Sequence, residues 1–337
     1  MLNKPLTVLN IKDPHFRGEF KPPVGREDDF KADIDSKIEQ VVNICKREKV
    51  DLITIAGDVF DIKQSSKYDP NKISSILKMI NKLKEATNLN KILTIAGNHD
   101  LPNSSVQMKE KSVYQLFVDA GVLQDINKEY TIDTKFGVVH FKGFDYQTKV
   151  SILKRKLRLY HKKINKTNKH FYNILIHEHI VPSNDKSREL KYLGSNMSYE
   201  SIRKIYPRFN VWFCGHFHKG YDTTTVGNQT IVNPWNFTRL ARNNYVLNDE
   251  HIPNVTIVKY GPGGVEAKDI SLVVRDYRIT NIDILEEDKE QQMDISGLLE
   301  QLSRTSIEDK ELKIKLNRSQ KLLLKDILNQ AKDNTQE

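Results

Sequence analysis

Residues 51–61 read Asp51-Leu52-Ile53-Thr54-Ile55-Ala56-Gly57-Asp58-Val59-Phe60-Asp61, an apolar run that ends in glycine and carboxylates. A short, continuous apolar run bounded by turn residues is typical of a buried strand. Similar runs occur at residues 6–11 and 91–96, and stretches with helical periodicity lie between the three runs at 35–46 and 73–83. Strands that alternate with helices predict an α/β fold.

The second half of the chain carries further strand-like runs with few helices between them. They lie at residues 137–144, 173–176, 211–214, 230–232 and 255–260, and residues 233–254 read as an irregular connection. We therefore expect a second, more antiparallel sheet stacked on the first. The predicted fold class is α/β, with two stacked mixed β-sheets flanked by helices and a small C-terminal appendage.

Almost every predicted strand ends in side chains that can bind a cation or move a proton. These clusters are Asp13-Pro14-His15, Asp58 to Asp61, Asn98-His99-Asp100, His177-Glu178-His179 and His216-Phe217-His218. In an open α/β sheet the carboxyl ends of the strands converge on one crevice, so we expect these residues to form one site. Four other histidines lack such neighbours and are interpreted as structural: His140, His161, His170 and His251.

The chemistry of these side chains predicts a metal site. Carboxylate oxygen, amide oxygen and imidazole nitrogen without thiolate suit Mn²⁺, Fe²⁺ or Zn²⁺. Alternation along a strand end places His216 and His218 on the same side, and Asp58 has two oxygens with which to bridge two ions. Two ions about 3.5 to 4 Å apart can clamp a phosphate and acidify a water, so no side-chain nucleophile is required.

The five clusters, in this order, resemble the pattern of the calcineurin-like metallophosphoesterase superfamily over residues 6–239. Within that superfamily, residues 25–30, 50–61 and 233–239 are similar to the SbcD nuclease branch, particularly to phage-encoded members. The resemblance implies a metal-dependent DNA nuclease that serves an SbcCD-like complex in DNA recombination, repair and replication. It would act as an exonuclease, and endonuclease activity is a further expectation.

Two alternatives to a nuclease remain. A protein phosphatase or a small-molecule phosphodiesterase could use the same scaffold, because fold and metal site do not fix the substrate. A catalytically silent binding module is disfavoured, because every metal-binding position of the family pattern is filled in this chain.

The resemblance also implies a role for each site residue. Asp13, His15, Asp58 and His218 would bind one ion, and Asp58, Asn98, His177 and His216 the other, with Mn²⁺ as the expected metal. His177 is preferred to His179 because it directly follows the apolar run 174–176. His99 would act as the general acid that protonates the departing 3′ oxygen. Asp61 would orient His99, although archaeal and eukaryotic nuclease members tend to carry histidine at the position of Asp61. Asp100 would cap the following turn.

The charge of the chain favours an acidic partner. The formal net charge is +9 and the pI is near 9.2. Residues 149–170 contain nine basic side chains and no carboxylate, with apolar residues interleaved at helical spacing. This pattern predicts an amphipathic helix whose cationic face contacts DNA phosphates, and a solvated surface helix is the alternative. The candidate DNA contacts are Lys154, Arg155, Arg158, Lys162 and Lys163.

We expect a cytoplasmic protein, because two cysteines cannot form a disulfide framework and no stretch resembles a secretory signal or a membrane span.

The expected domains are a catalytic domain over residues 1–265 and an appendage over residues 266–337. A last strand is predicted at 273–279. Amphipathic segments at 295–302 and 322–328 either pack on their own domain or dock the coiled coil of an SbcC-type ATPase. A second copy of the chain is a further expected partner.

Overall fold

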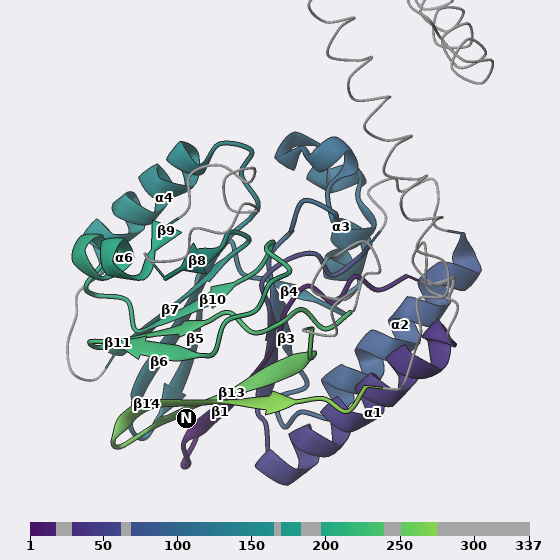
Figure 1. The fold of residues 1–337 in the computed structure, drawn as a ribbon, viewed down its shortest axis with the longest axis horizontal. Helices are drawn as coiled ribbons and strands as arrows, with labels where there is room; N and C mark the ends of the chain where they lie inside the picture. The colour runs from purple at the N-terminus through teal and green to yellow at the C-terminus, as the bar shows by residue number, and fades with distance from the viewer. Residues whose placement is uncertain (18–28, 62–68, 165–169, 183–196, 239–250, 275–337) are drawn as a thin grey trace, which may run out of the picture. The chain divides into compact units, whose positions relative to one another are not determined.

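The computed structural model describes residues 1–17, 29–61, 69–164, 170–182, 197–238 and 251–274. Within these ranges the chain forms two β-sheets packed face to face, with helices on both outer sides (Figure 1). The predictions for residues 25–28, for residue 239 and for 275–337 lie outside the described residues, and so does most of the predicted appendage.

The first sheet has the strand order β14-β13-β1-β2-β3-β4. Its parallel part consists of β1 (Leu6–Ile11), β2 (Leu52–Ile55), β3 (Ile92–Thr94) and β4 (Gln124–Asp125). The hairpin of β13 (Asn254–Gly261) and β14 (Gly264–Ser271) extends it on one side. Three helices share an apolar core with its outer face: α1 (Phe30–Glu48), α2 (Pro70–Glu85) and α3 (Val113–Asp119). The 3-10 turns η2 (Pro102–Ser104) and η3 (Val106–Lys111) precede α3.

The second sheet has the strand order β11-β12-β10-β7-β6-β5. Its strands are β5 (Tyr130–Thr134), β6 (Gly137–Phe144), β7 (His170–Ile176), β10 (Val211–Cys214), β11 (Thr224–Val226) and β12 (Gln229–Val232). Two helices, α4 (Val150–Lys163) and α6 (Tyr199–Ile205), pack on its outer face. A small parallel pair, β8 (Ile180–Val181) and β9 (Met197–Ser198), follows β7.

A second apolar core lies between the two sheets. It joins Leu6 and Val8 of β1 with Phe141 of β6, Leu175 of β7 and Phe213 of β10, all fully buried. The layers therefore run helix, sheet, sheet, helix, and burial of apolar surface at each of the three interfaces holds them together. This arrangement confirms the predicted fold class.

The second sheet is not more antiparallel than the first, and our expectation on this point was wrong. Among the described strands, each six-stranded sheet contains three parallel and two antiparallel pairings. Parallel neighbours need a crossover connection, and here α4 joins β6 to β7 while α6 precedes β10. With seven residues, α6 is too short for its periodicity to stand out in the sequence.

Aspartates fix where α1 and α2 begin. Asp29 accepts a hydrogen bond from the backbone N–H of Ala32 at 3.0 Å, and Asp69 accepts one from Lys72 at 2.9 Å. At the other end of α1, Lys49 has a left-handed φ of 54°, which stops the helix and turns the chain into β2. None of the helices in the described ranges combines the length and the apolar character that crossing a membrane requires.

The hairpin at the edge of the first sheet runs past the expected domain boundary. β14 pairs with β13 from Gly264 to Ser271, so the sheet continues beyond residue 265. The first compact unit of the chain is Met1–Ile282, and the second, Asp283–Glu337, lies outside the described residues. The boundary between catalytic domain and appendage stays a prediction.

Glu48, the last residue of α1, ties the helix to this hairpin. Its carboxylate lies 3.0 Å from Nζ of Lys268 and 3.2 Å from Nζ of Lys259. These lysines, Lys268 first, lower the pKa of Glu48 from 4.5 to about 2, although burial acts in the opposite direction. Because the pKa in the folded state is the lower one, the ion pairs stabilise the fold above about pH 4.5, and this contribution is lost as the pH falls towards 2.

Glu48→Gln should lower the midpoint of thermal unfolding at pH 7 by roughly 1 to 3 °C, the size expected of a partly exposed ion pair. The difference from the unmodified chain should shrink as the pH falls from 4.5 towards 2. Glu39→Gln is the matched control, because Glu39 pairs only with Lys82 among the described residues and its side chain is 54% exposed. A difference that did not change with pH would contradict the ion-pair account.

Candidate metal centre

Loops that follow five strands bring the predicted site residues together. Asp13 and His15 follow β1, Asp58 follows β2, Asn98 and His99 follow β3, His177 follows β7, and His216 and His218 follow β10. β1, β2 and β3 are parallel neighbours in one sheet, and β7 and β10 are parallel neighbours in the other. All seven predicted metal ligands and His99 therefore lie in one place.

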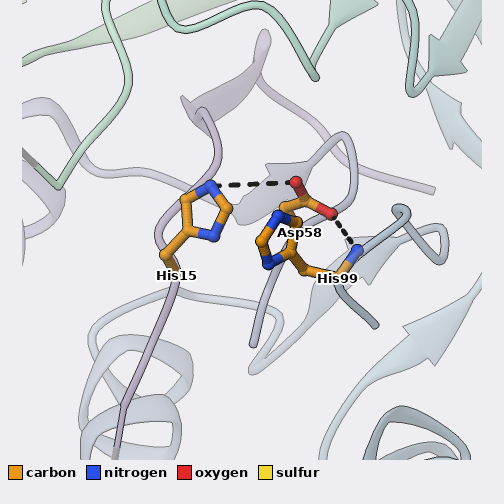
Figure 2. Close-up of side chains that lie close together, drawn as sticks. All are labelled: His15, Asp58 and His99. Carbon is orange, nitrogen blue, oxygen red and sulfur yellow. Dashed lines mark hydrogen bonds and ion pairs between the residues drawn. The ribbon is translucent and has the colours of Figure 1, made fainter. Parts of the chain in front are cut away.

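The first group of side chains surrounds one oxygen of Asp58. Nε2 of His15 lies 3.7 Å from Asp58 Oδ2 and 3.2 Å from Nε2 of His218. The ring of His99 lies edge to face with that of His15, with 4.9 Å between the ring centroids. Figure 2 shows His15 and the backbone nitrogen of His99 bound to different oxygens of the Asp58 carboxylate.

The second group surrounds the other oxygen of Asp58 and the amide oxygen of Asn98. Nε2 of His177 lies 3.3 Å from Asp58 Oδ1 and 2.9 Å from Asn98 Oδ1, and Nδ1 of His216 lies 3.0 Å from the same amide oxygen. Nδ1 of His177 lies 2.8 Å from the carbonyl oxygen of Ala56. Since a carbonyl can only accept, Nδ1 carries a proton, and Nε2 is the nitrogen that faces Asp58 and Asn98.

Asp13 completes the second group. Its Oδ1 lies 3.8 Å from Nδ1 of His177 and accepts a hydrogen bond from the backbone N–H of His216 at 3.1 Å. Its Oδ2 is buried and has no hydrogen-bond partner among the described residues. Asp13 thus holds the loop after β10 in place with one oxygen, while its other oxygen is left without a partner among the described residues.

The backbone is strained at the positions that carry these side chains. Asp13, His15, Asp58 and His216 have φ values of 40°, 48°, 48° and 78°, in the left-handed region that residues with a Cβ atom rarely adopt. Each such residue costs about 1 to 3 kcal/mol, so the conformation persists only where the surroundings enforce it. Backbone hydrogen bonds from His15 to Asp58 at 3.0 Å and from Phe16 to Val59 at 2.8 Å enforce it here.

Two glycines let the loops after β2 and β3 approach each other. Gly57 has a φ of 93°, and a Cβ atom at this position would lie 2.8 Å from Cα of Gly97. A Cβ atom on Gly97 would overlap the backbone nitrogen and Oδ1 of Asp58 and come within 2.9 Å of the His177 ring. The glycine in each motif is therefore required by close packing around the bridging aspartate.

Asp100 joins the same two loops without facing the candidate ligands. Its buried carboxylate accepts hydrogen bonds from the backbone N–H groups of Phe60, Gly97 and Val59 at 2.8, 2.8 and 3.2 Å. The prediction that Asp100 caps the turn after it was wrong, because these donors precede it or lie in the loop after β2. Burial and the neighbouring Asp58 raise the pKa of Asp100 to about 7.

Burial sets the protonation of the site histidines. It lowers the pKa of His216 to about 3, that of His218 to about 4 and that of His15 well below its usual value. Burial also lowers the pKa of His177, but Asp58 and Asp13 outweigh it and raise that pKa to about 9. His15, His216 and His218 are thus neutral near pH 7 and have lone pairs to offer.

The residues present fit divalent cations. Two groups of side chains, Asp13 with Asp58 and His177, and His15 with Asp58 and His99, place ligating atoms within 4.8 Å of one another and share Asp58. Burial raises the pKa of Asp13 to about 7, which is the mark of a carboxylate without sufficient compensating charge. Buried oxygens and imidazole lone pairs that face each other cost free energy unless a cation lies between them.

The structure links His99 to Asp61 through the backbone of Asp61. Nδ1 of His99 lies 2.7 Å from the carbonyl oxygen of Asp61. The Asp61 carboxylate instead pairs with Arg17 and lies 3.5 Å from Nδ1 of His15. The predicted contact of Asp61 with His99 is present, but the atom that makes it is the carbonyl and not the carboxylate.

His179 lies beside the site and not between the two groups. Its Nδ1 lies 2.9 Å from Oε1 of Glu178, and its ring stacks on that of His216 with 6.3 Å between the centroids. Of the two histidines after β7, His177 is the one next to Asp58 and Asn98.

The predicted DNA contacts are not part of this cluster. They lie on α4, whose Leu153 and Leu157 are buried against the second sheet. Arg155, Arg158, Lys162 and Lys163 are exposed and Lys154 is half-buried. Of the nine basic residues predicted for this stretch, Lys166 and Lys169 lie outside the described residues.

Some residues near the site carry no sequence signal of their own. Lys12 is fully buried, and its Nζ donates to Asn233 Oδ1 at 2.6 Å and to the carbonyl of Lys219 at 3.3 Å. Burial lowers the pKa of Lys12 to about 8. The ring of Tyr146 lies 5.6 Å from that of His216 and 5.9 Å from that of His177. Two sequence features could have pointed to Lys12 and Asn233: Lys12 is next to Asp13, and Asn233 lies in the segment 233–239.

Residues 7–220 match the family described as calcineurin-like phosphoesterase. The match spans well over half of the chain, and the chain belongs to this family. The clustered side chains supply candidate ligands for the divalent metals that this family uses. A search of curated proteins found no match.

Three similar solved structures belong to other proteins. The "Putative 5'-Nucleotidase from Staphylococcus aureus" is 9% identical with a TM-score of 0.47, and the match covers 85% of this chain and 58% of that one. The NAD nucleotidase of Haemophilus influenzae is 12% identical with a TM-score of 0.42, and the match covers 80% of this chain and 56% of that one. The protein TT1561 of Thermus thermophilus is also 12% identical with a TM-score of 0.42, and the match covers 79% of this chain and 99% of that one. The chain spans less than two thirds of the first two proteins.

Gly97→Ala should weaken metal binding strongly and destabilise the fold, because the added methyl group displaces Asp58. We expect manganese affinity, measured by titration calorimetry, to fall at least about a hundredfold, as it does when groups that hold metal ligands in place are disturbed. Gly263→Ala is the matched control, since the nearest atom to its Cβ is Glu266 Oε1 at 4.0 Å. Wild-type affinity in Gly97→Ala would show that the loops are not packed as described.

Proposed function

We propose that the chain is a metal-dependent DNA nuclease of the SbcD type that hydrolyses phosphodiester bonds. The observation that carries the hydrolytic part is the convergence of seven candidate ligands on two positions that share Asp58. The family membership supports the same chemistry. DNA as the substrate is supported by the seven lysines and arginines within 149–163, a stretch without a carboxylate.

Asp13, His15, Asp58 and His218 would hold one ion, and Asp58, Asn98, His177 and His216 the other, with manganese as the proposed metal. Because Oδ1 of Asp13 touches the second group, Asp13 would serve the first ion through Oδ2, its unsatisfied oxygen. When bound, two ions supply Lewis acidity for the phosphate and a water acidified to a near-neutral pKa. Asp58 fixes the spacing of the two positions, because its two oxygens face different groups of histidines. The hydrogen bond from His177 to the Ala56 carbonyl fixes the ring so that Nε2 points into the site.

His99 would serve as the general acid. Its Nδ1 must carry a proton, because it lies 2.7 Å from the Asp61 carbonyl, which can only accept. Nε2 is then the nitrogen that can hold a second proton and release it to the departing 3′ oxygen, after which the ring is neutral and still bound to Asp61. The backbone N–H of His99 donates to Asp58 at 2.8 Å, which holds the acid beside the reacting phosphate.

We also propose that an SbcC-type coiled-coil ATPase is the partner of this chain and that the chain associates with itself. The proposed place of action is the cytoplasm, which is that of a host cell if the chain is phage-encoded. The amphipathic segments at 295–302 and 322–328 would provide the docking element. They lie outside the described residues, and so the proposal rests on the sequence.

His99→Ala should keep its manganese but lose hydrolysis of a chromogenic phosphodiester by about 10² to 10⁴-fold, the usual contribution of a general acid. Asp58→Ala should lose both. His140→Ala is the control, because His140 lies on β6 away from the site and pairs with Glu129 and His170. Metal content after gel filtration and initial rates of hydrolysis decide the two roles. The assignment would be wrong if His99→Ala protein lost its metal while Asp58→Ala protein kept it.

DNA binding should weaken steeply with salt. If four phosphates of a single strand are contacted, affinity should fall about 50-fold between 50 and 200 mM salt, measured by fluorescence anisotropy without metal. Turnover of the chromogenic diester should barely change over the same range. Purified protein with Mn²⁺ and labelled linear DNA gives the direct test. Hydrolysis of the diester or of phosphoprotein without cleavage of DNA would favour a phosphatase or small-molecule phosphodiesterase.

A further inference from the structure

A cavity between α4 and α6 lies outside the candidate metal centre. Its volume is about 360 Å³, within the usual size of small-ligand sites. Lys154 and Arg158 of α4 line one side, and residues of β9 and α6, with Tyr206 after them, line the other. Lys154 and Arg158 are four positions apart and so share one helix face.

Among the described residues, the cationic groups of the cavity have no acidic neighbour in its lining. No carboxylate is among its lining residues in the described part of the chain. Neither Lys154 nor Arg158 forms an ion pair with a described residue, while Lys142 and Lys156 elsewhere on this side share a depression with Glu129. This side of the cavity is suited to a phosphate group.

The opposite wall carries apolar residues next to Ser198 and Ser201. Met197 and Ile202 are buried, while Ile205 is 41% exposed although it is a large aliphatic residue. The ring of Tyr206 packs on Phe209 and Trp212, and its hydroxyl donates to the carbonyl of Lys154 at 3.2 Å. An apolar wall facing two cations matches a ligand with a flat or apolar part and an anionic part, and a nucleotide has both.

The cavity lies within reach of the metal centre along the chain. Val181, which lines it, follows His177 by four residues, so the two Cα atoms are at most roughly 14 Å apart. That length corresponds to about four nucleotide steps of a B-form strand. The Val181 edge of the cavity is therefore only a few nucleotide lengths from His177.

We propose that this cavity is a nucleotide subsite. It holds one nucleotide of the DNA strand away from the reacting phosphodiester, with the phosphate on Lys154 and Arg158 and the sugar and base against Ile205, the exposed apolar residue of the opposite wall. The proposal rests on the proposed nuclease function and deepens it. It gives Lys154 and Arg158 a specific role among the basic residues of α4, and it explains why this part of the helix faces a cavity with a partly exposed apolar wall.

The test measures binding of 5′-fluorescein-labelled oligothymidylates of two to eight nucleotides by anisotropy, in EDTA so that no cleavage occurs. For the unmodified chain, affinity should rise sharply at the length at which the strand first reaches the cavity. The double variant Lys154→Gln/Arg158→Gln should lose this rise and bind the longer oligomers at least about tenfold more weakly, since two charge-assisted contacts are removed. Lys149→Gln/Lys156→Gln removes the same charge from the N-cap and the body of α4 and should keep the rise.

A second arm separates a nucleotide site from a plain phosphate site. Ile205→Ala should weaken competition by deoxyadenosine monophosphate several-fold and leave competition by inorganic phosphate unchanged. Equal losses in the two double variants, or no effect of Ile205→Ala, would overturn the subsite. The proposed nuclease function itself fails if the unmodified chain hydrolyses a chromogenic diester with Mn²⁺ but neither binds nor cleaves DNA. This result differs from failure of the subsite alone, in which the unmodified chain binds DNA and both double variants lose the same affinity.

Discussion

The Asp58 carboxylate is the interaction on which the site depends. One oxygen lies 3.7 Å from His15, and the other lies 3.3 Å from His177 and accepts the His99 N–H at 2.8 Å. A fully buried carboxylate is tolerated only when it is paired and hydrogen-bonded. Its partners come from the loops after β1, β3 and β7, so satisfying this one residue fixes the edges of both sheets relative to each other.

This constraint explains the local departures from ideal backbone geometry. Side chains from five loops reach one point only if the loops turn sharply, and the left-handed φ values of Asp13, His15 and His216 produce those turns. Gly57 and Gly97 lack the Cβ atoms that would keep the loops apart. The hydrogen bonds of Asp100 to the loops after β2 and β3 resist their separation. The strain is retained because packing and hydrogen bonding determine the same geometry several times over.

The sequence predicted the features that have a local signal. The buried strands of the first sheet, α1, α2 and the clusters after the strands all appear as apolar runs or helical periods followed by ligand-type side chains. β4 is two residues long and β14 is half-exposed and charged, so neither has an apolar pattern to find. The contact between Lys12 and Asn233 joins residues 221 positions apart, and the bond from His99 to Asp61 uses a backbone carbonyl. No local pattern encodes contacts of this kind.

The candidate metal centre and the basic side chains of α4 lie in different layers of the fold. The centre lies at the edge of the two sheets, where burial fixes nearly every side chain. The helix α4 is held on the outer face of the second sheet mainly by Leu153 and Leu157, so its exposed positions are free of constraints from the centre. Its basic side chains are therefore not needed for the fold. Because a basic, carboxylate-free surface attracts polyanions and an ordinary solvated helix mixes both signs of charge, the composition of α4 argues for a long anionic substrate.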